Sequence, residues 1–188
     1  MADIVKTMKL HLHVKDDDVA TAFKKVTITY ADACNYVSEY TFNNGFELNS
    51  NRLQKVLYSS VRSEYGLKSQ FAVSVFKTVT ARYKTIQEQM KQNPYKYQDE
   101  IEKWHCIPRT LEWLHKPVHF RRPQADLVRG RDYSFVEDGT LISINTLGKR
   151  VKLSLISRTA SKSISMVPGL LELQSLSVST MNGICTSQ

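Results

Sequence analysis

Polar and apolar residues alternate along the opening segment of the chain, at 5–14, which is the period of a half-buried strand. Beyond Asp18, apolar residues recur every three or four positions as far as Tyr40, and this spacing predicts an amphipathic helix. The β-branched run Val26–Tyr30 locally favours a strand, but the longer periodicity outweighs it. We expect the helix to end at Asn43-Asn44-Gly45.

Two further helices follow at the same spacing. The first covers 50–65 and is closed by Gly66. The second begins near Ser69, a candidate N-cap, and stops at Asn93-Pro94. We expect one more short helix over 97–104. These elements together predict a helical unit that follows the first strand.

The pattern changes to β in the last third of the chain. A basic loop punctuated by prolines comes first, at 115–123, and apolar and polar residues alternate from Tyr133 onward. Asp138-Gly139 is a strong hairpin signal, and a second turn is predicted at 147–149, which gives three antiparallel strands in succession. We expect these strands to share one sheet with the opening strand, so the predicted fold class is α+β. From about Leu155 onward, Ser and Thr prevail and the apolar residues follow no period.

Composition favours an anionic partner. The chain has 188 residues, a formal net charge of +8 and 41% hydrophobic residues, which suffices for a buried core beneath a cationic surface. A basic protein with a merely solvated cationic face is the alternative. Three scattered cysteines without a CxxC pair predict neither a disulfide framework nor a zinc ribbon, and they are typical of a reducing cytoplasm. We expect no membrane span and no signal peptide.

No catalytic constellation emerges from the residues. His105 and Cys106 are adjacent, and adjacent side chains seldom aim at each other as base and nucleophile. His11 and His13 lie on one face of the opening strand without an evident third metal ligand. The acidic run Asp16–Asp18 is typical of a helix N-terminus. We therefore expect neither a catalytic nor a metal site in this chain.

Candidate nucleic-acid contacts come from basic residues on the predicted helices and in the loop after them. Where the third helix starts, free N–H groups and the helix dipole favour phosphate, and Ser and Gln side chains can reach base edges. Arginines interleaved with aromatic residues around 115–133 suit phosphate contact and base stacking. An ordinary capped helix start and a solvated loop are the alternatives. The predicted backbone contacts are Lys55, Arg62, Lys68, Lys77, Arg82, Arg121, Arg122, Arg129 and Arg131, and the predicted base-reading residues are Ser69 and Gln70.

The segment 129–153, RGRDYSFVEDGTLISINTLGKRVKL, resembles the TnpB-type (OrfB) proteins of small insertion sequences. These proteins are RNA-guided nucleases, and a similar sequence motif lies in their wedge domain, just before the nuclease domain. The stretches LYSSVRSEY at 57–65, LKSQFAVSVFKTV at 67–79 and ARYK at 81–84 are similar to the family's recognition lobe. The resemblance covers most of the chain up to about Leu153.

The resemblance implies a wedge-type β-barrel with an inserted helical bundle, the recognition lobe. The parts would be a first wedge strand at 1–15, the recognition lobe at 16–105, the wedge β part at 106–154 and an irregular tail at 155–188. The chain would grip guide RNA and the guide–target duplex and read a short motif that flanks the target, while base pairing reads the target itself. The implied partners are guide RNA and DNA, in a bacterial cytoplasm beside the nucleoid, and no membrane is implied.

The family's cutting machinery has no counterpart in the sequence. Its RuvC-like domain carries three metal-binding acidic residues and a CxxC…CxxC zinc element, so without them we expect no Mg or Zn cofactor and no cleavage. Read in a shifted frame, Ile164–Gly169 permits the codons of Phe-Asp-Gly-Thr-Trp, which is common in the family, so we expect a frameshift near 153–157. A genuine irregular tail is the alternative. A nuclease-dead DNA- or RNA-binding regulator and a decayed remnant without function stay open, as does the oligomeric state.

Overall fold

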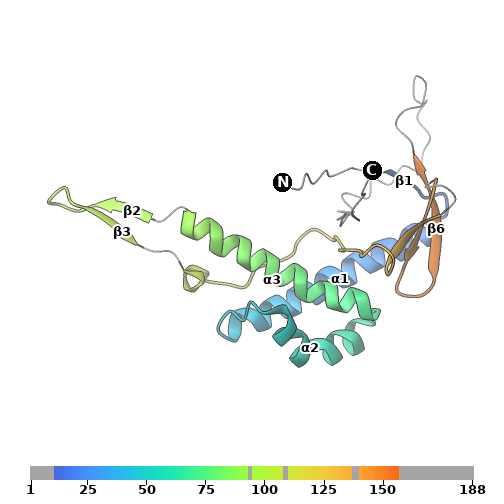
Figure 1. The fold of residues 1–188 in the computed structure, drawn as a ribbon, viewed down its shortest axis with the longest axis horizontal. Coiled ribbons are helices and arrows are strands. Elements are labelled where there is room, and N and C mark those ends of the chain that lie inside the picture. The colour runs from blue at the N-terminus through green and yellow to red at the C-terminus, as the bar shows by residue number, and fades with distance from the viewer. Residues whose placement is uncertain (1–10, 93–94, 108–109, 137–139, 157–188) are drawn as a thin grey trace, which may run out of the picture.

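The computed structural model describes residues 11–92, 95–107, 110–136 and 140–156. Three helices pack together beside a four-stranded antiparallel sheet, and a two-stranded hairpin projects beyond the far end of the third helix (Figure 1). This arrangement confirms the α+β class. In chain order the elements are β1 (His11–His13), α1 (Asp17–Asn43), α2 (Ser50–Tyr65), α3 (Ser69–Gln92), β2 (Tyr95–Gln98), β3 (Trp104–Ile107), the 3₁₀ helix η1 (Leu111–Trp113), β4 (Tyr133–Val136), β5 (Leu141–Asn145) and β6 (Arg150–Ile156).

The sheet joins the beginning of the chain to its late strands, as the sequence predicted. Its strand order is β1-β6-β5-β4, and Leu12 of β1 lies opposite Leu155 of β6. The helices are therefore inserted between neighbouring strands. In the described part of the chain the sheet is open, with β1 and β4 at its edges. The rest of the predicted opening strand, the turn at Asp138-Gly139 and the tail beyond Ile156 lie outside the described residues.

The three helices begin and end close to where the periodicity and the capping residues place them. At the start of α1, the Asp16 carboxylate accepts a hydrogen bond from the Asp18 N–H at 2.9 Å. Gly66 ends α2 in the left-handed conformation with φ 59°, which glycine adopts at little cost. The predicted cap of α3 is wrong by one residue. Lys68 takes the cap position, because its carbonyl accepts the first helical bond from the Ala72 N–H, and Ser69 is already helical.

Helices and sheet share one hydrophobic core. The β-branched run Val26–Tyr30 lies in the helix α1. Its two end residues, Val26 and Tyr30, are both buried on the inner face of that helix. Tyr133 of β4, Ile144 of β5 and Val151 of β6 belong to the same cluster of buried side chains as these helical residues. Burial of this shared surface is the main stabilising contribution to the arrangement.

The short helix predicted at 97–104 is wrong, because this segment forms the β2–β3 hairpin. Tyr97 pairs with His105, and their rings stack at 5.1 Å between centroids. The Asp99 carboxylate makes the turn by accepting hydrogen bonds from the backbone N–H groups of Ile101 and Lys103, and it also contacts His105 at 2.6 Å. Side chain-to-backbone bonds of this kind compete with helix formation and favour a turn.

The long segment between η1 and β4 is tied to both α1 and α3. The Ser38 hydroxyl donates to the Val118 carbonyl at 2.6 Å, and the Val118 N–H donates to the Tyr83 hydroxyl at 3.2 Å. Two residues later, the Phe120 N–H donates to Asn35 Oδ1 at 2.7 Å. These bonds hold the segment against the helices immediately before its two adjacent arginines.

Candidate nucleic-acid interface

The start of α3 and the turn before β4 meet, although they are 61 residues apart in the sequence. The Arg131 guanidinium donates a hydrogen bond to Gln70 Oε1 at 2.8 Å. Lys68 and Ser69 directly precede Gln70, and Arg129 belongs to the same turn as Arg131. We call these five residues, all of them predicted contacts, the junction surface.

The turn before β4 is built so that its two arginines stay exposed. Gly130, which separates them, has φ +80° and donates its N–H to the Tyr133 carbonyl at 2.7 Å. A positive φ of this size favours glycine, because a side chain there is strained. The Arg129 guanidinium lies over the ring of Phe135, 5.5 Å from its centroid, in a cation–π contact. Arg129 and Arg131 are both exposed beside the start of α3.

Asp132 is the buried support of this turn. Its carboxylate accepts a hydrogen bond from the Val128 N–H at 2.9 Å, and its own N–H donates to the Val128 carbonyl at 2.8 Å. The side chain is 1% exposed, and its Oδ1 has no hydrogen-bond partner among the described residues. Burial raises the pKa of Asp132, and the Val128 N–H and the cations Arg150, Arg131 and Lys68 only partly offset this rise. A buried acid thus lies within the electrostatic reach of the junction surface.

As pH increases from acid to neutral, the free energy of unfolding of Asp132→Asn is expected to rise relative to that of the wild type. Because the pKa of Asp132 is raised in the folded state, its contribution to stability is fully present below the unfolded pKa of about 3.9 and is lost as pH rises through the folded pKa. Asp132→Asn keeps an acceptor for the Val128 N–H and removes this loss. Urea unfolding of both proteins at several pH values measures the difference. A variant that instead loses stability relative to the wild type as pH rises contradicts the assignment.

Three polar residues that the sequence-based prediction missed border the junction surface. Arg150 donates to the Ser134 hydroxyl at 3.3 Å, and the Asn145 side-chain amide donates to the Arg131 carbonyl at 3.0 Å. Arg150 is exposed and the next residue, Val151, is buried. This alternation at period two is the sequence signal that could have placed Arg150 on the outer face of the sheet.

The other predicted contacts are exposed but separate. Lys55 and Arg62 lie on α2, and the Arg62 guanidinium covers the ring of Tyr58 at 5.8 Å from its centroid. Among the described residues, no hydrogen bond or ion pair connects the remaining six predicted cations to the junction surface. These six are Lys55, Arg62, Lys77, Arg82, Arg121 and Arg122, the last two in the segment held by Asn35.

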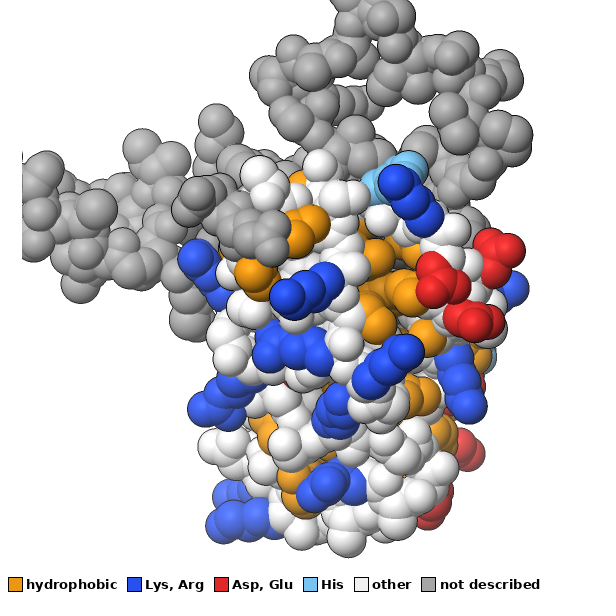
Figure 2. All heavy atoms as spheres, turned by 90° about the vertical axis from the view of Figure 1, so that its right-hand side faces the viewer, with side chains coloured by type: hydrophobic (Ala, Val, Ile, Leu, Met, Phe, Trp, Pro, Cys, Tyr) orange, Lys and Arg blue, Asp and Glu red, His pale blue; other side chains and the backbone are white. Residues whose placement is uncertain are grey.

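None of the predicted cations forms an ion pair with a carboxylate among the described residues. Within the ranges that the structure describes, the ion pairs are Arg52–Glu47, Lys91–Glu88 and His105–Asp99, and none includes a predicted contact. Figure 2 shows the end of the molecule at the right of Figure 1. Lys and Arg side chains are spread over this face, and acidic side chains gather near one edge of it. A surface of this kind attracts phosphate without first having to break an internal ion pair.

No metal site accompanies the junction surface in the described part of the chain, where no group of three or more His, Cys, Asp or Glu side chains is placed to hold a metal ion. None of the helices within those ranges is both long and apolar enough to cross a membrane.

Comparisons with protein-family models, with curated proteins and with solved structures return no match.

Proposed function

We propose that the chain binds nucleic acid through the junction surface and does not cut it. The observation that carries the proposal is the Arg131–Gln70 hydrogen bond, which gathers cations from two distant segments at the start of a 24-residue helix. Free N–H groups and the helix dipole favour phosphate at such an end, and guanidinium groups bind phosphate through charge-assisted hydrogen bonds.

The resemblance of 129–153 to TnpB-type proteins supports a more specific form of the proposal. The ligands would be guide RNA and the DNA beside its target, bound by a wedge-type barrel with an inserted recognition lobe. The order of the elements supports this form, because β1 pairs with β6 and the three helices lie between them in the chain. In this form the chain contributes binding alone.

The paired side chains of Gln70 and Arg131 form a base-reading unit in this proposal. Gln70 Oε1 already accepts a hydrogen bond from Arg131, so the pair presents N–H donors to a ligand. Donors of this kind match the O6 and N7 acceptors of guanine in the major groove. Reading of a flanking motif is therefore assigned to Gln70 together with Arg131, with Ser69 beside them.

The salt dependence of binding tests the general proposal. Fluorescence anisotropy with a labelled DNA duplex should give a plot of log affinity against log salt with a slope of about −3 or steeper, because each of at least three phosphate contacts contributes about −0.9. A labelled single-stranded RNA should show a shallower slope for the same contacts. An affinity that does not change with salt would contradict an interface made of cations and phosphates.

The identity of the bound RNA tests the specific form. The protein would be purified from cells that carry its surrounding DNA, and the RNA that copurifies would be sequenced. The RNA-guided form predicts enrichment of transcripts from the end of its own element. Background RNA alone contradicts that form, and if binding is nevertheless strongly salt-dependent, the chain is a general nucleic-acid-binding regulator.

A further inference from the structure

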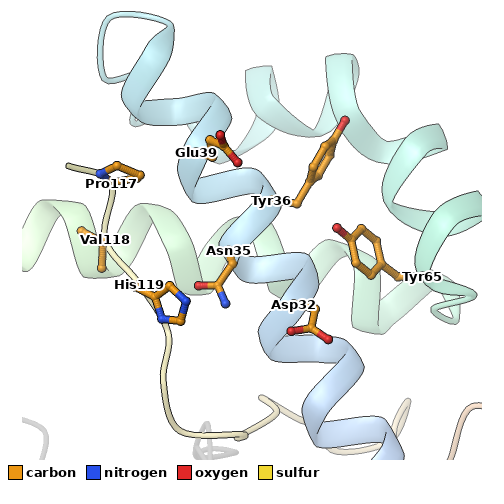
Figure 3. A pocket seen from close by; sticks show the side chains of 8 residues that line it. All are labelled: Asp32, Asn35, Tyr36, Glu39, Tyr65, Pro117, Val118 and His119. Carbon is orange, nitrogen blue, oxygen red and sulfur yellow. The ribbon is translucent and has the colours of Figure 1, made fainter.

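A hollow of about 360 Å³ lies on the exposed face of α1, away from the residues of the junction surface. The hollow is lined by residues 32–39 of α1, by Tyr65 at the end of α2 and by the segment 117–119. Figure 3 shows Tyr36 and Tyr65 together on one side of α1, Glu39 and Asp32 above and below Asn35 along the same helix, and His119 on the opposite side. On a chain with a net charge of +8, this hollow presents carboxylates and aromatic rings.

The two carboxylates are spaced along one side of the helix. Asp32 and Glu39 are seven residues apart, which is two turns, so they lie on the same face about 10 Å apart along the axis at 1.5 Å per residue. Tyr36 lies between them, and its ring is 6.0 Å from that of Tyr65 between centroids, at an angle of 49°. An aromatic surface is thus flanked by a negative charge at each end.

The carboxylates and tyrosine hydroxyls of the hollow have no hydrogen-bonding partner among the described residues of the protein. The Asn35 amide is occupied by the backbone of Phe120, to which it both donates and accepts. Among the described residues, the carboxylates of Asp32 and Glu39 and the hydroxyls of Tyr36 and Tyr65 form no hydrogen bond or ion pair. Four unpaired acceptors therefore line one hollow.

The electrostatic surroundings of Tyr65 are acidic throughout. Burial raises the pKa of Tyr65, and the nearby carboxylates Glu64, Asp32 and Glu39 raise it further, as does Tyr36. No cation is among the groups that act on this hydroxyl. The hollow therefore repels phosphate and attracts positive charge, opposite to the junction surface.

We propose that this hollow binds a linear polyamine, with one ammonium group at Asp32, another at Glu39 and the carbon chain across Tyr36 and Tyr65. The separation of the carboxylates is comparable to that of the terminal ammonium groups of extended spermidine. Tyrosine rings attract ammonium groups through cation–π contacts and cover methylene groups. The described residues of the hollow are not arranged to hold a metal ion, which favours an organic cation. The inference does not depend on the proposed binding of nucleic acid.

Nuclear magnetic resonance titration of the full, nucleic-acid-free chain with spermidine at constant ionic strength tests the proposal. The backbone amides of 32–39 and of Tyr65 should shift together and saturate. Putrescine is shorter and reaches one carboxylate at a time, so it should bind more weakly. Asp32→Asn with Glu39→Gln should lower the spermidine affinity about tenfold, because each exposed ion pair contributes up to about fivefold. Tyr36→Leu should weaken binding, and Tyr36→Phe should retain it.

The matched control is Glu100→Gln with Glu102→Gln, which removes the same charge from the exposed β2–β3 turn. Thermal unfolding of each variant establishes that it is folded. Equal spermidine affinity in the two double variants, or equal affinity for spermidine and putrescine, would overturn the proposal in favour of non-specific counterion binding. Saturable shifts at these same amides with a lysine-rich peptide, and none with spermidine, would overturn it in favour of a basic protein segment as the occupant.

Discussion

Replacement of Lys68, Arg129 and Arg131 by alanine in one variant is expected to weaken binding of a DNA duplex by about two to three orders of magnitude at about 0.1 M salt. The three side chains lie around one hydrogen bond, between Arg131 and Gln70, and none of them is held in an ion pair in the described part of the chain. Each lost phosphate contact should also reduce the salt slope by about 0.9. Fluorescence anisotropy over a range of salt concentrations measures both effects.

A matched triple variant separates this site from the overall charge of the protein. Lys91, Lys96 and Lys103 lie in the last turn of α3 and in the β2–β3 hairpin, at the end of the molecule opposite the sheet (Figure 1). Their replacement by alanine removes the same charge but should reduce affinity much less. Equal losses in the two variants would show that net charge, and not the junction surface, governs binding. Gln70→Ala alone should relax preference between sequences and leave the salt slope nearly unchanged.

The helices were predictable because several independent signals agree at each of them. Val26 and Tyr30 belong to a β-branched run, yet they lie four residues apart on the buried face of α1, and the acidic residues at 16–18 cap the same helix. The hairpin β2–β3 was missed because its side chains carry no such period. Trp104 is 67% exposed, and β3 alternates only between exposed and half-buried positions, so no buried hydrophobic face marks the strands. Hydrogen bonds from the Asp99 carboxylate make this turn, and an acidic residue in a polar stretch is equally compatible with a helix.

The residue types of the site were predictable, but their assembly was not. Local patterns assign Lys68 and Gln70 to a helix start and Arg131 to a separate basic segment, and periodicity alone does not bring these segments together. Their meeting depends on the shared core of helices and sheet and on the turn that Asp132 supports. Asp132 carries no distinguishing signal in the sequence, because an acid beside arginines is commonly an exposed partner. Its burial follows from tertiary packing, which no local pattern reports.

Tyr83→Ala is expected to lower the free energy of unfolding by about 3–5 kcal/mol, since it leaves a cavity in the core and unpaired polar groups around it. The ring is fully buried on α3, and its hydroxyl joins Ser38 of α1 to the Val118 N–H. Such a loss is a large fraction of the about 5–15 kcal/mol typical of a folded domain. Urea unfolding measures it. Tyr58→Ala, at a half-buried position of α2 where the ring packs against the edge of the core, is the matched control and should cost less.

Tyr83→Phe isolates the hydroxyl and tests whether it holds the segment that carries Arg121 and Arg122. This variant keeps the ring, so its expected cost is about 1–3 kcal/mol, chiefly from the Val118 N–H that loses its acceptor. Amide hydrogen exchange should accelerate more at Val118 than at Phe120, whose N–H is bonded to Asn35. Unchanged exchange at Val118 would show that the Tyr83 hydroxyl does not hold the segment. Faster exchange there, together with weaker nucleic-acid binding, would connect the buried hydrogen bonds to the presentation of both arginines.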